Sequence, residues 1–293
     1  MSGLFIKTDS SLSSKNPREA REEVRRQAVE TIAKLEGLDR VKRELNLLLA
    51  FASIIAERKR RELKTEPMSM HMLFVGPPGT GKTEVARQVG KLLYSVGLLK
   101  RGHVVETDKS GLVGQHVGDT PKLVADKFEE ARDGVLFVDE AYTLADGMYG
   151  KEAIETLMKL MEDFREDTVV IFAGYEADIN KLLATNAGME SRFTRKMVFE
   201  AYGDESLVRI FNSIVVRGGY VVDQGAEKEI ENKIAAMTRG GRKDPQFGNA
   251  RAVRSLFEKI ITNQAMRLSD SDLSSLSDKE LVTIVRSDVE QVE

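Results

Sequence analysis

Between residues 70 and 199, short apolar runs alternate with longer amphipathic stretches. Runs this short predict strands, and the amphipathic stretches between them, such as Glu84–Leu93 and Glu152–Phe164, predict helices. Alternation of this kind is typical of βαβ units with a buried parallel sheet. We therefore predict an α/β fold with a five-stranded parallel sheet flanked by helices. The predicted strands are Met70–Val75, Val104–Glu106, Val135–Val138, Val169–Phe172 and Met197–Phe199.

Helical periodicity also precedes the first strand and follows the last one. Two helices are predicted at residues 16–35 and 39–61, with Gly37 between them. After about Tyr202 the strand pattern nearly stops, which indicates a second, mostly helical domain. Its predicted elements are helices at residues 204–216, 226–238 and 249–268 and a short strand near 282–285.

The length and composition fit a globular protein with two domains. The chain has 293 residues, of which 41% are apolar and 31% are charged, and its net charge is −3. A charge this small gives no reason to expect a nucleic-acid partner. We expect a frayed tail at 1–15, and we divide the chain into an N-terminal tail and helix at 1–36, an α/β domain at 37–202 and a helical domain at 203–293.

Several classes of site are excluded by composition. The chain has no cysteine, so it has no disulfide, thiolate metal site or cysteine nucleophile, and three histidines cannot build a dense histidine metal site. The longest apolar stretch, Leu45–Ala56, is interrupted by polar residues and is too short for a membrane span. The N-terminus lacks an apolar signal core, so we expect a cytoplasmic location.

The strongest chemical signal is Gly76–Thr83, which fits the pattern G-x-x-x-x-G-K-[ST] directly after a predicted strand and before a predicted helix. Glycines let the backbone wrap around phosphate oxygens, and the helix N-terminus favours an anion. Lys82 is predicted to reach the β- and γ-phosphates, and the Thr83 hydroxyl to bind Mg²⁺. The predicted nucleotide-binding residues are Gly76, Pro77, Pro78, Gly79, Thr80, Gly81, Lys82, Thr83 and Glu84.

A second signal is Asp139-Glu140, at the end of the predicted strand Val135–Val138. Open α/β sheets bind ligands at the carboxyl ends of their strands. Asp139 is predicted to hold Mg²⁺, and Glu140 to polarise the attacking water. The alternative is a pair of carboxylates in an ordinary loop. A guanine-reading [NT]-K-x-D motif is missing, and Glu84 takes the third glycine position of a dinucleotide G-x-G-x-x-G, so we favour adenine as the base.

These motifs occur in an order that resembles the AAA+ ATPases, and within them the CbbX/CfxX and stage V sporulation protein K family. The segments that carry the resemblance are Gly76–Thr83, Leu112–Gly118, Asp139–Tyr142, Ala173–Tyr175, Asn186–Phe193 and Gly248–Arg251. The EccA ATPases of type VII secretion share this core but carry a large helical N-terminal domain. Only about 36 residues precede the core here, which does not favour EccA.

The resemblance implies roles for several arginines. Arg192 matches the arginine finger that reaches the γ-phosphate bound by a neighbouring subunit, with Arg195 as a weaker candidate. The alternative for Arg192 is a surface pair with Glu190. Arg251 matches the sensor-2 arginine of the helical lid, and Arg254 lies on the same polar helix face.

Three further assignments follow from the resemblance. Leu38 and Val41 are expected to line the adenine pocket, although simple core packing explains them nearly as well. Tyr175 occupies the sensor-1 position, where many relatives have Asn or Thr, and its role stays open. His116-Val117-Gly118 aligns with the central-pore loop, with His116 in place of the usual aromatic residue. A flexible loop is the alternative there, and Met148-Tyr149 is a candidate second pore loop.

Together these features predict an ATP- and Mg²⁺-dependent motor or chaperone, similar to Rubisco activases, that works as a ring, expected to be a homohexamer. Its substrate is expected to be a protein, with the Rubisco large subunit as one candidate, and neither membrane nor nucleic acid is expected as a partner. The main alternative is a nucleic-acid-linked ATPase of clamp-loader or helicase-loader type. Only the basic segments Arg58–Arg61 and Arg239–Lys243 support it. A non-hydrolysing scaffold is a second alternative, which the complete set of catalytic residues argues against.

Overall fold

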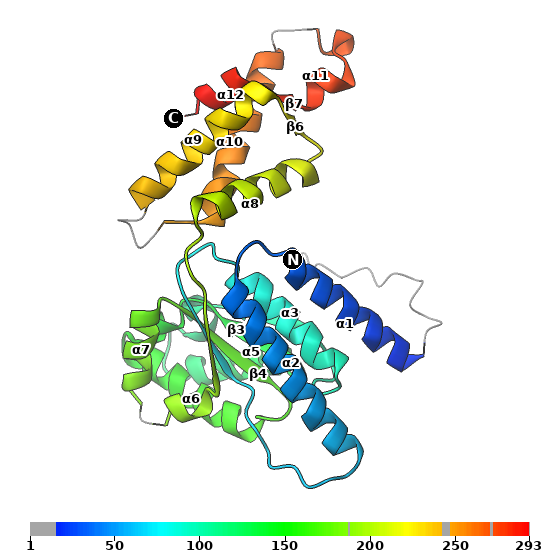
Figure 1. The fold of residues 1–293 in the computed structure, drawn as a ribbon. Helices are drawn as coiled ribbons and strands as arrows, with labels where there is room; N and C mark the ends of the chain where they lie inside the picture. The colour runs from blue at the N-terminus through cyan, green and yellow to red at the C-terminus, as the bar shows by residue number, and fades with distance from the viewer. Residues whose placement is uncertain (1–15, 187, 242–246, 270–271, 293) are drawn as a thin grey trace.

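The computed structural model describes residues 16–186, 188–241, 247–269 and 272–292. The tail expected at 1–15, Ala187 of the Asn186–Phe193 motif, and Arg242 and Lys243 of a basic segment lie outside these residues. Figure 1 shows a larger part that contains the main sheet, and a helical part joined to it near α8. The predicted α/β architecture with a helical second part is confirmed.

The main sheet is parallel and has five strands, as predicted. The strand order is β2-β3-β4-β1-β5, so β1 and β4 lie in its middle. Residues of these two strands are completely or almost completely buried, because helices cover both faces of the sheet. The strands are β1 (Met72–Val75), β2 (Val104–Thr107), β3 (Val135–Val138), β4 (Val169–Gly174) and β5 (Arg195–Val198).

Two layers of helices sandwich the sheet, and alternate strand residues face alternate layers. Phe74 joins the core under α1, α2 and α3, whereas Leu73 and Val75 join the core under α5, α6 and α7. Helix α1 supplies Ala28 and Ile32 to the first of these cores and so packs as part of the α/β unit. The helices are α1 (Pro17–Lys34), α2 (Asp39–Arg60), α3 (Lys82–Ser95), α4 (Lys109–Leu112), α5 (Asp119–Glu130), α6 (Met148–Asp163) and α7 (Glu176–Ala184).

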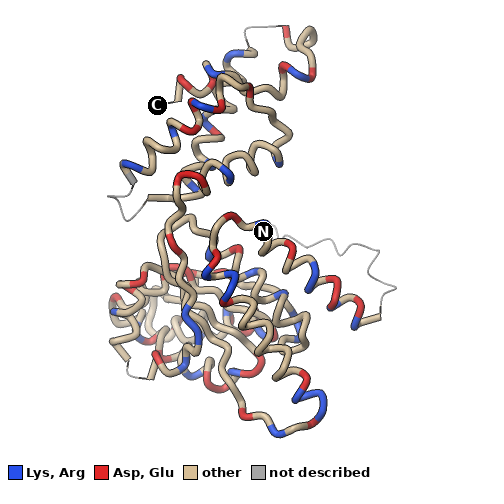
Figure 2. Tube along the Cα trace, viewed as in Figure 1, with Lys and Arg blue, Asp and Glu red and all other residues tan. Residues whose placement is uncertain are grey.

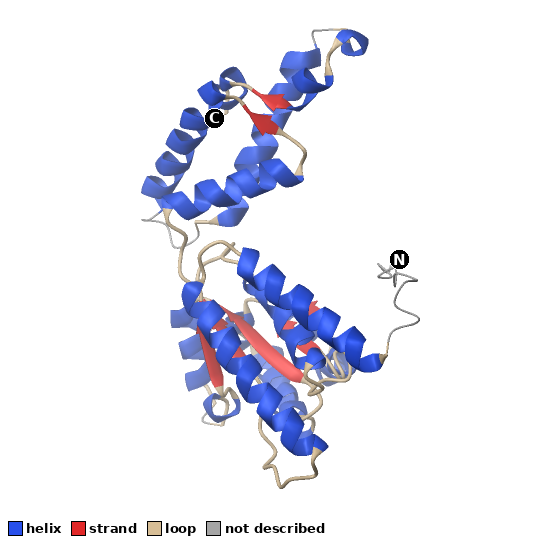
Figure 3. Ribbon diagram, turned by 45° about the vertical axis from the view of Figure 1, so that its right-hand side comes forward, coloured by secondary structure: helices blue, strands red, loops and turns tan. Residues whose placement is uncertain are grey.

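The second part has its own core, built from the apolar faces of three long helices (Figure 3). A buried pair links its ends: Asp288 is 1% exposed and accepts from Nε of Arg267 at 2.7 Å. The three predicted helices and the strand near 282–285 are present, and that strand pairs with β6. The elements are α8 (Asp204–Arg217), β6 (Val221–Val222), α9 (Gln224–Gly241), α10 (Ala250–Ser269), α11 (Asp278–Val282), β7 (Thr283–Ile284) and α12 (Arg286–Glu290).

The basic run at the end of α2 lies at the lower edge of the molecule and is drawn in blue in Figure 2. Three of its four charges are paired within the chain: Arg60 and Arg61 bond Glu57, and Lys59 lies 3.2 Å from Glu166, whereas Arg58 donates to the carbonyl of Lys64. Among the helices that the structure describes, none combines the length and apolar character needed to cross a bilayer.

Candidate nucleotide site

The loop Gly76–Thr83 joins the end of β1 to the start of α3, at the carboxyl edge of the sheet. Its three glycines have φ values of 152°, 68° and 94°, which side-chain-bearing residues rarely adopt. A Cβ on Gly76 would overlap the carbonyl of Phe199, and one on Gly79 would overlap the carbonyl of Gly248. The backbone angles therefore favour glycine at all three positions, and close packing also requires it at Gly76 and Gly79. The loop leads directly into the N-terminus of α3.

Lys82 is held inside this loop. Its Nζ donates to the carbonyls of Gly76 and Pro77 at 2.9 and 2.7 Å. Burial lowers the pKa of the Lys82 ammonium; the carboxylates of Asp139 and Glu140 oppose that effect, and the charge of Arg251 adds to it. The charges of Asp139, Glu140 and Arg251 therefore each lie close enough to act on Lys82. Burial makes the charged form of Lys82 less stable. An anion such as phosphate bound beside it would stabilise that charged form.

Asp139 and Glu140 follow β3 directly, one strand away from β4 and two from β1. The backbone N–H of Asp139 donates to Thr107 at 2.8 Å, which fixes the strand end, and Oδ1 of Asp139 accepts from the N–H of Glu140 at 3.0 Å. Glu140 is exposed and has a φ of 47°. A carboxylate-bearing residue in this left-handed region is strained, as is common at functional sites.

Thr83 lies in the first turn of α3, one residue after Lys82. The carboxylate of the next residue, Glu84, accepts from Nε2 of Gln88 at 2.6 Å. A carboxylate has no donor for phosphate, so Glu84 could bind an anion only through its backbone N–H. No cluster of three or more His, Cys, Asp or Glu that would suit a metal occurs in the described part of the chain. A Mg²⁺ ion here would take protein ligands from Thr83 and Asp139 and the rest from phosphate and water, as Mg²⁺ commonly does.

Two tyrosines lie next to Glu140. The rings of Tyr142 and Tyr175 are 6.3 Å apart, and Tyr142 packs over Gly174, which leaves no space for a Cβ there. Burial raises the pKa of the Tyr142 hydroxyl, and the charge of Glu140 adds to this. Tyr175, the residue at the predicted sensor-1 position, thus packs against Tyr142, two residues after Glu140.

A cavity of about 400 Å³ lies between the start of α2 and the junction with the lid. Leu38 and Val41 both line it, and Val41 is also buried in the core at 1% exposed, so packing and pocket lining coexist there. The cavity adjoins the phosphate loop, because a Cβ on Gly81 would lie 3.7 Å from Leu38 Cδ1 and from the hydroxyl of Tyr202. Its size and its place beside the loop suit a base and ribose.

Arg251 begins α10 and is exposed, with its N–H donating to Gly248 at 2.8 Å. A Cβ on Gly79 would lie 3.1 Å from the backbone N of Arg251, so Arg251 starts beside the phosphate loop, and its charge also acts on Lys82; both observations favour it over Arg254. The predicted two-faced character of this helix is present: Val253, Leu256 and Ile260 are buried, whereas Arg251 and Arg254 are exposed.

Arg192 ends the short 3-10 helix η3 (Glu190–Arg192) that precedes β5. Its Nη1 donates to the carbonyl of Gly188 at 2.7 Å, and its Nε lies 3.8 Å from Glu162. The alternative pair with Glu190 is therefore wrong: the carboxylate beside Arg192 comes from the end of α6. Arg195 points elsewhere, with its guanidinium 5.1 Å from the ring centre of Phe51 on α2.

His116, Val117 and Gly118 form an exposed loop between α4 and α5, and Val117 is 86% exposed. The loop is shaped by Asp119, whose carboxylate accepts from the N–H of His116 at 3.2 Å. Met148, which is 73% exposed, and Tyr149 form the first turn of α6 and are therefore helical.

A hydrogen bond joins the residues that precede the two candidate pore segments. Lys109, in α4, donates to the carbonyl of Asp146 at 3.3 Å, just before α6. An exposed valine and an exposed methionine thus lie on neighbouring segments of the α/β part.

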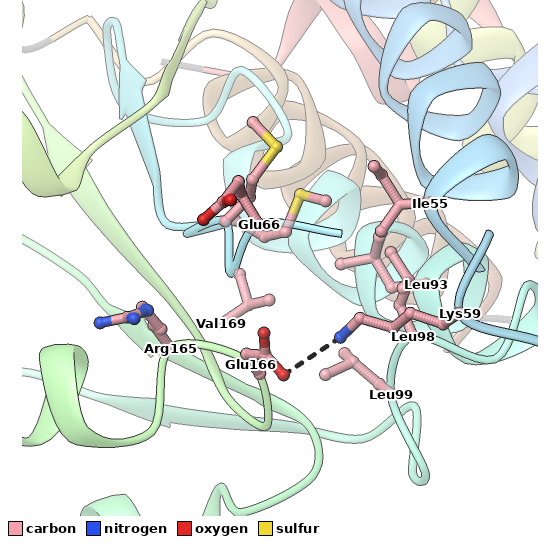
Figure 4. A pocket seen from close by; sticks show the side chains of 11 residues that line it. Ile55, Lys59, Glu66, Leu93, Leu98, Leu99, Arg165, Glu166 and Val169 are labelled. Carbon is pink, nitrogen blue, oxygen red and sulfur yellow. Dashed lines mark hydrogen bonds and ion pairs between the residues drawn. The ribbon is translucent and has the colours of Figure 1, made fainter. Parts of the chain in front are cut away.

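A second, smaller cavity lies near the amino ends of β1 and β4, away from the phosphate loop (Figure 4). Apolar side chains such as Leu93, Leu99 and Val169 line it, and Lys59 and Glu166 pair beside it. Its interior of about 30 Å³ has room for one or two water molecules only. This cavity does not accommodate a nucleotide.

Sequence reasoning missed Tyr202 and Asn249 as site residues. The hydroxyl of Tyr202 donates to the carbonyl of Thr80 at 3.1 Å, and the amide of Asn249 donates to Pro78 at 3.1 Å. Asn249 is 1% exposed and has a φ of 45°. The available signal in the sequence was an Asn directly after a glycine, at the start of a predicted helix.

Each of the two parts of the chain matches a known protein family. Residues 72–201 match the model of the ATPase family associated with various cellular activities (AAA), and residues 203–293 match the AAA lid domain. The AAA domain of FIGL-1, crystallised with ADP, has a similar fold, with a TM-score of 0.60 and 19% identity over 88% of this chain and 82% of that one.

Relatives of higher identity are also found. Stage V sporulation protein K of Bacillus subtilis is 36% identical over 92% of this chain and 84% of its own length. CfxQ of Xanthobacter flavus is 36% identical over 87% of this chain and 80% of its own length. The ESX-3 secretion protein EccA3 of Mycobacterium leprae is 37% identical over 90% of this chain, which spans only 44% of that relative.

Proposed function

Because the chain belongs to the AAA ATPase family, in the group that includes stage V sporulation protein K and CfxQ, we propose that it binds ATP with Mg²⁺ and hydrolyses it. The observation that carries this proposal is the electrostatic cluster at the carboxyl edge of the sheet. There Nζ of Lys82 is bonded inside a glycine-rich loop, and the charges of Asp139, Glu140 and Arg251 each act on it.

Each residue of the cluster has a distinct role in this proposal. Lys82 leaves the carbonyls of Gly76 and Pro77 and donates to phosphate oxygens, where its charge offsets that of the triphosphate. Thr83 and Asp139 hold Mg²⁺, which supplies charge neutralisation at the phosphates. Glu140 accepts a proton from the attacking water, and its exposed position at the strand end leaves it free to do so. Arg251, which belongs to the lid, interacts with the phosphates and so makes the position of the lid depend on whether they are bound.

The base and ribose are proposed to occupy the cavity between Leu38 and Tyr202. Movement of the lid, residues 203–293, against the α/β unit at 37–202 then converts binding and hydrolysis into motion. Residues 1–36 are proposed to form an N-terminal segment. The apolar face of α1 packs against the α/β unit.

The active form is proposed to be a ring, with a homohexamer as the state to test. The support is Arg192, which precedes the edge strand β5 and matches a finger that acts on the site of a neighbouring subunit. In such a ring the exposed loop at His116 and the exposed Met148 face a protein substrate, which makes the molecule a remodelling motor or chaperone. A cytoplasmic location fits the cysteine-free composition.

The substrate is proposed to be a protein, and the Rubisco large subunit is the candidate to test first, because of the likeness to CfxQ. Components of sporulation and secretion systems come next, after the other relatives. No described feature favours nucleic acid over protein: in the run at Arg58–Arg61, the charges of Lys59, Arg60 and Arg61 are paired with carboxylates of the chain.

The proposal is tested with purified protein, by measuring binding of ATP and GTP and release of phosphate. Wild type should bind and hydrolyse ATP in preference to GTP, and Lys82→Ala should bind ATP at least tenfold more weakly, because a charged hydrogen bond to phosphate is lost. Arg87→Ala is the matched control: it removes a cation five residues along α3 that pairs with Glu106 on the surface. Failure of wild type to bind either nucleotide would overturn the proposal.

A further inference from the structure

The carbonyl groups of the phosphate loop are all occupied as hydrogen-bond acceptors. Those of Gly76 and Pro77 accept from Lys82, and that of Pro77 also accepts from the hydroxyl of Thr80. The next three come from Pro78, Gly79 and Thr80, and each accepts from a residue outside the loop.

The donors to these three carbonyls lie at the start of the lid and at its hinge. Asn249 Nδ2 donates to Pro78 at 3.1 Å, the N–H of Ala250 donates to Gly79 at 3.2 Å, and the hydroxyl of Tyr202 donates to Thr80 at 3.1 Å. Burial raises the pKa of Tyr202 to about 12, so this hydroxyl remains a donor at neutral pH. The loop is thus held from its outer side by the other part of the molecule.

Asn249 is the centre of this contact, because its side-chain amide is fully used. One amide group donates to Pro78 and to Phe247, while its oxygen accepts from the N–H of Tyr202 at 3.0 Å. The side chain is buried, and its backbone has a positive φ that Asn tolerates better than most residues. It therefore ties the hinge residue, the start of α10 and the phosphate loop into one unit.

Holding these carbonyls also orients the phosphate-binding groups. In a planar trans peptide the C=O of one residue and the N–H of the next point in opposite directions. Carbonyls of Pro78, Gly79 and Thr80 that point to the lid therefore turn the N–H groups of Gly79, Thr80 and Gly81 away from it, toward the inside of the loop. Those are the groups that cradle phosphate in a loop of this kind.

We propose that Asn249 is a positioning residue that, together with Tyr202, holds the peptide planes of the phosphate loop in the orientation that binds phosphate. The inference rests on the proposed nucleotide site and adds to it a direct link between lid position and phosphate affinity. A seated lid presents the loop N–H groups, and a displaced lid releases them. The lid thus acts on phosphate through the loop backbone as well as through Arg251.

The test compares three variants of the full chain. Asn249→Gly removes all three side-chain hydrogen bonds, to Pro78, Phe247 and Tyr202, while keeping a residue that adopts positive φ without strain. Tyr202→Phe removes the hydroxyl alone and keeps the ring. Asn263→Ala is the matched control, because Asn263 bonds the carbonyl of Asp288 within the lid and does not contact the loop.

Two measurements are made on each variant. The first is hydrogen exchange of the peptide covering residues 76–83 without nucleotide, and the second is affinity for ADP compared with adenosine. Asn249→Gly should speed exchange of the loop amides and weaken ADP about tenfold, with adenosine changed less than twofold, because only the phosphate cradle is disturbed. Tyr202→Phe should act in the same direction by about threefold. Asn263→Ala should change neither quantity.

Equal exchange and equal ADP affinity in wild type and Asn249→Gly would overturn the assignment. An equal loss of ADP and adenosine would also overturn it, since that marks general damage to the lid. The proposed function fails separately, if wild type binds no nucleotide. In that case the exchange measurement still decides whether Asn249 holds the loop.

Discussion

Arg192 lies against Glu162 of its own chain, with Nε of Arg192 3.8 Å from Oε2 of Glu162. The same guanidinium donates to the carbonyl of Gly188, and Glu162 also pairs with Arg165. An arginine finger in this position has to leave these partners before it reaches a neighbouring subunit. Glu162 closes helix α6, whose other end carries Met148 and Tyr149, so this helix connects a candidate pore segment with the finger.

Arg192 is predicted to act between subunits, so its loss should be rescued by mixing. Arg192→Ala and Lys82→Ala should each be nearly inactive alone, since fingers of this kind contribute about 10³-fold or more to turnover. In mixed rings some interfaces join an intact nucleotide site to an intact Arg192, and ATPase activity should exceed the sum of the parents. The measurement is phosphate release across mixing ratios. A role within one subunit predicts no rescue at any ratio.

Glu140→Gln is predicted to bind ATP normally but to hydrolyse it at least 100-fold more slowly. The carboxylate that accepts the proton of water is lost, while Asp139 and Lys82 remain. Steady-state phosphate release and ATP titration check the two halves separately. Glu129→Gln, which changes an exposed carboxylate on α5 outside the nucleotide cavity, is the control and should retain turnover. Turnover of Glu140→Gln within threefold of wild type would exclude Glu140 as the base.

His116→Ala is predicted to leave basal ATPase activity within twofold of wild type and to reduce work on a protein substrate severalfold. The loop is exposed and is separate from the phosphate loop. His116→Tyr should preserve or raise that work, because a larger aromatic ring stacks better on an extended peptide. The readout is ATP-dependent unfolding or remodelling of the candidate substrate. Equal work by the Ala, His and Tyr forms would end the pore assignment.

Because His71 is buried, we predict that the folded protein loses stability in mild acid. Burial lowers its pKa to about 4, and its two ring nitrogens are used: Nδ1 accepts from Val170 at 3.0 Å and Nε2 bonds Met161 at 3.1 Å. Between pH 6.5 and 4 the unfolded chain binds a proton at His71 that the folded chain does not. The contribution of His71 to the free energy of unfolding should therefore be fully present above pH 6.5. The free energy of unfolding should fall by roughly 3 kcal/mol as the pH drops to 4.

Urea unfolding at several pH values checks this prediction. His71→Gln should lower stability at pH 7 and remove most of the slope that one titrating group contributes. His116→Gln, at an exposed position, should keep that slope. An unchanged slope in His71→Gln would assign the acid sensitivity to other groups.

The ion pair of Arg267 with the buried carboxylate of Asp288 predicts a stability effect confined to the lid. Asp288→Ala should lower the free energy of unfolding by about 2 kcal/mol, because the partly exposed guanidinium and the N–H of Val285 lose their acceptor. Glu290→Ala removes an exposed pair with Arg286 and should cost less than about 1 kcal/mol. Thermal or denaturant unfolding measures both. Equal effects of the two substitutions would contradict the burial argument.

The core of the candidate site was readable from the sequence because its signals are local. Gly76, Gly79 and Gly81 are needed for a loop whose backbone turns at those positions, and the strand before it and helix after it are encoded in neighbouring residues. Asp139-Glu140 was found in the same way, since an apolar run predicts where a buried strand ends. The parallel five-stranded sheet followed from alternation of apolar runs with helices.

Some local elements were nevertheless missed. Helix α5 has Thr120, Val124 and Phe128 buried at helical spacing, but the flanking loop of glycines and polar residues obscured where it begins. The start of α6 was placed four residues late, because Met148-Tyr149-Gly150 has weak helical character by itself.

Contacts between distant residues were decided by the tertiary structure alone. Arg192 has carboxylates near it in the sequence, yet its neighbour is Glu162, because packing of α6 under the sheet brings that residue to η3. Asn249 lies 171 residues from Pro78 along the chain, and only the seating of the lid brings its amide to the phosphate loop. Periodicity and motif spacing report the backbone within one element, whereas hydrogen bonds such as these depend on how separately folded elements pack together.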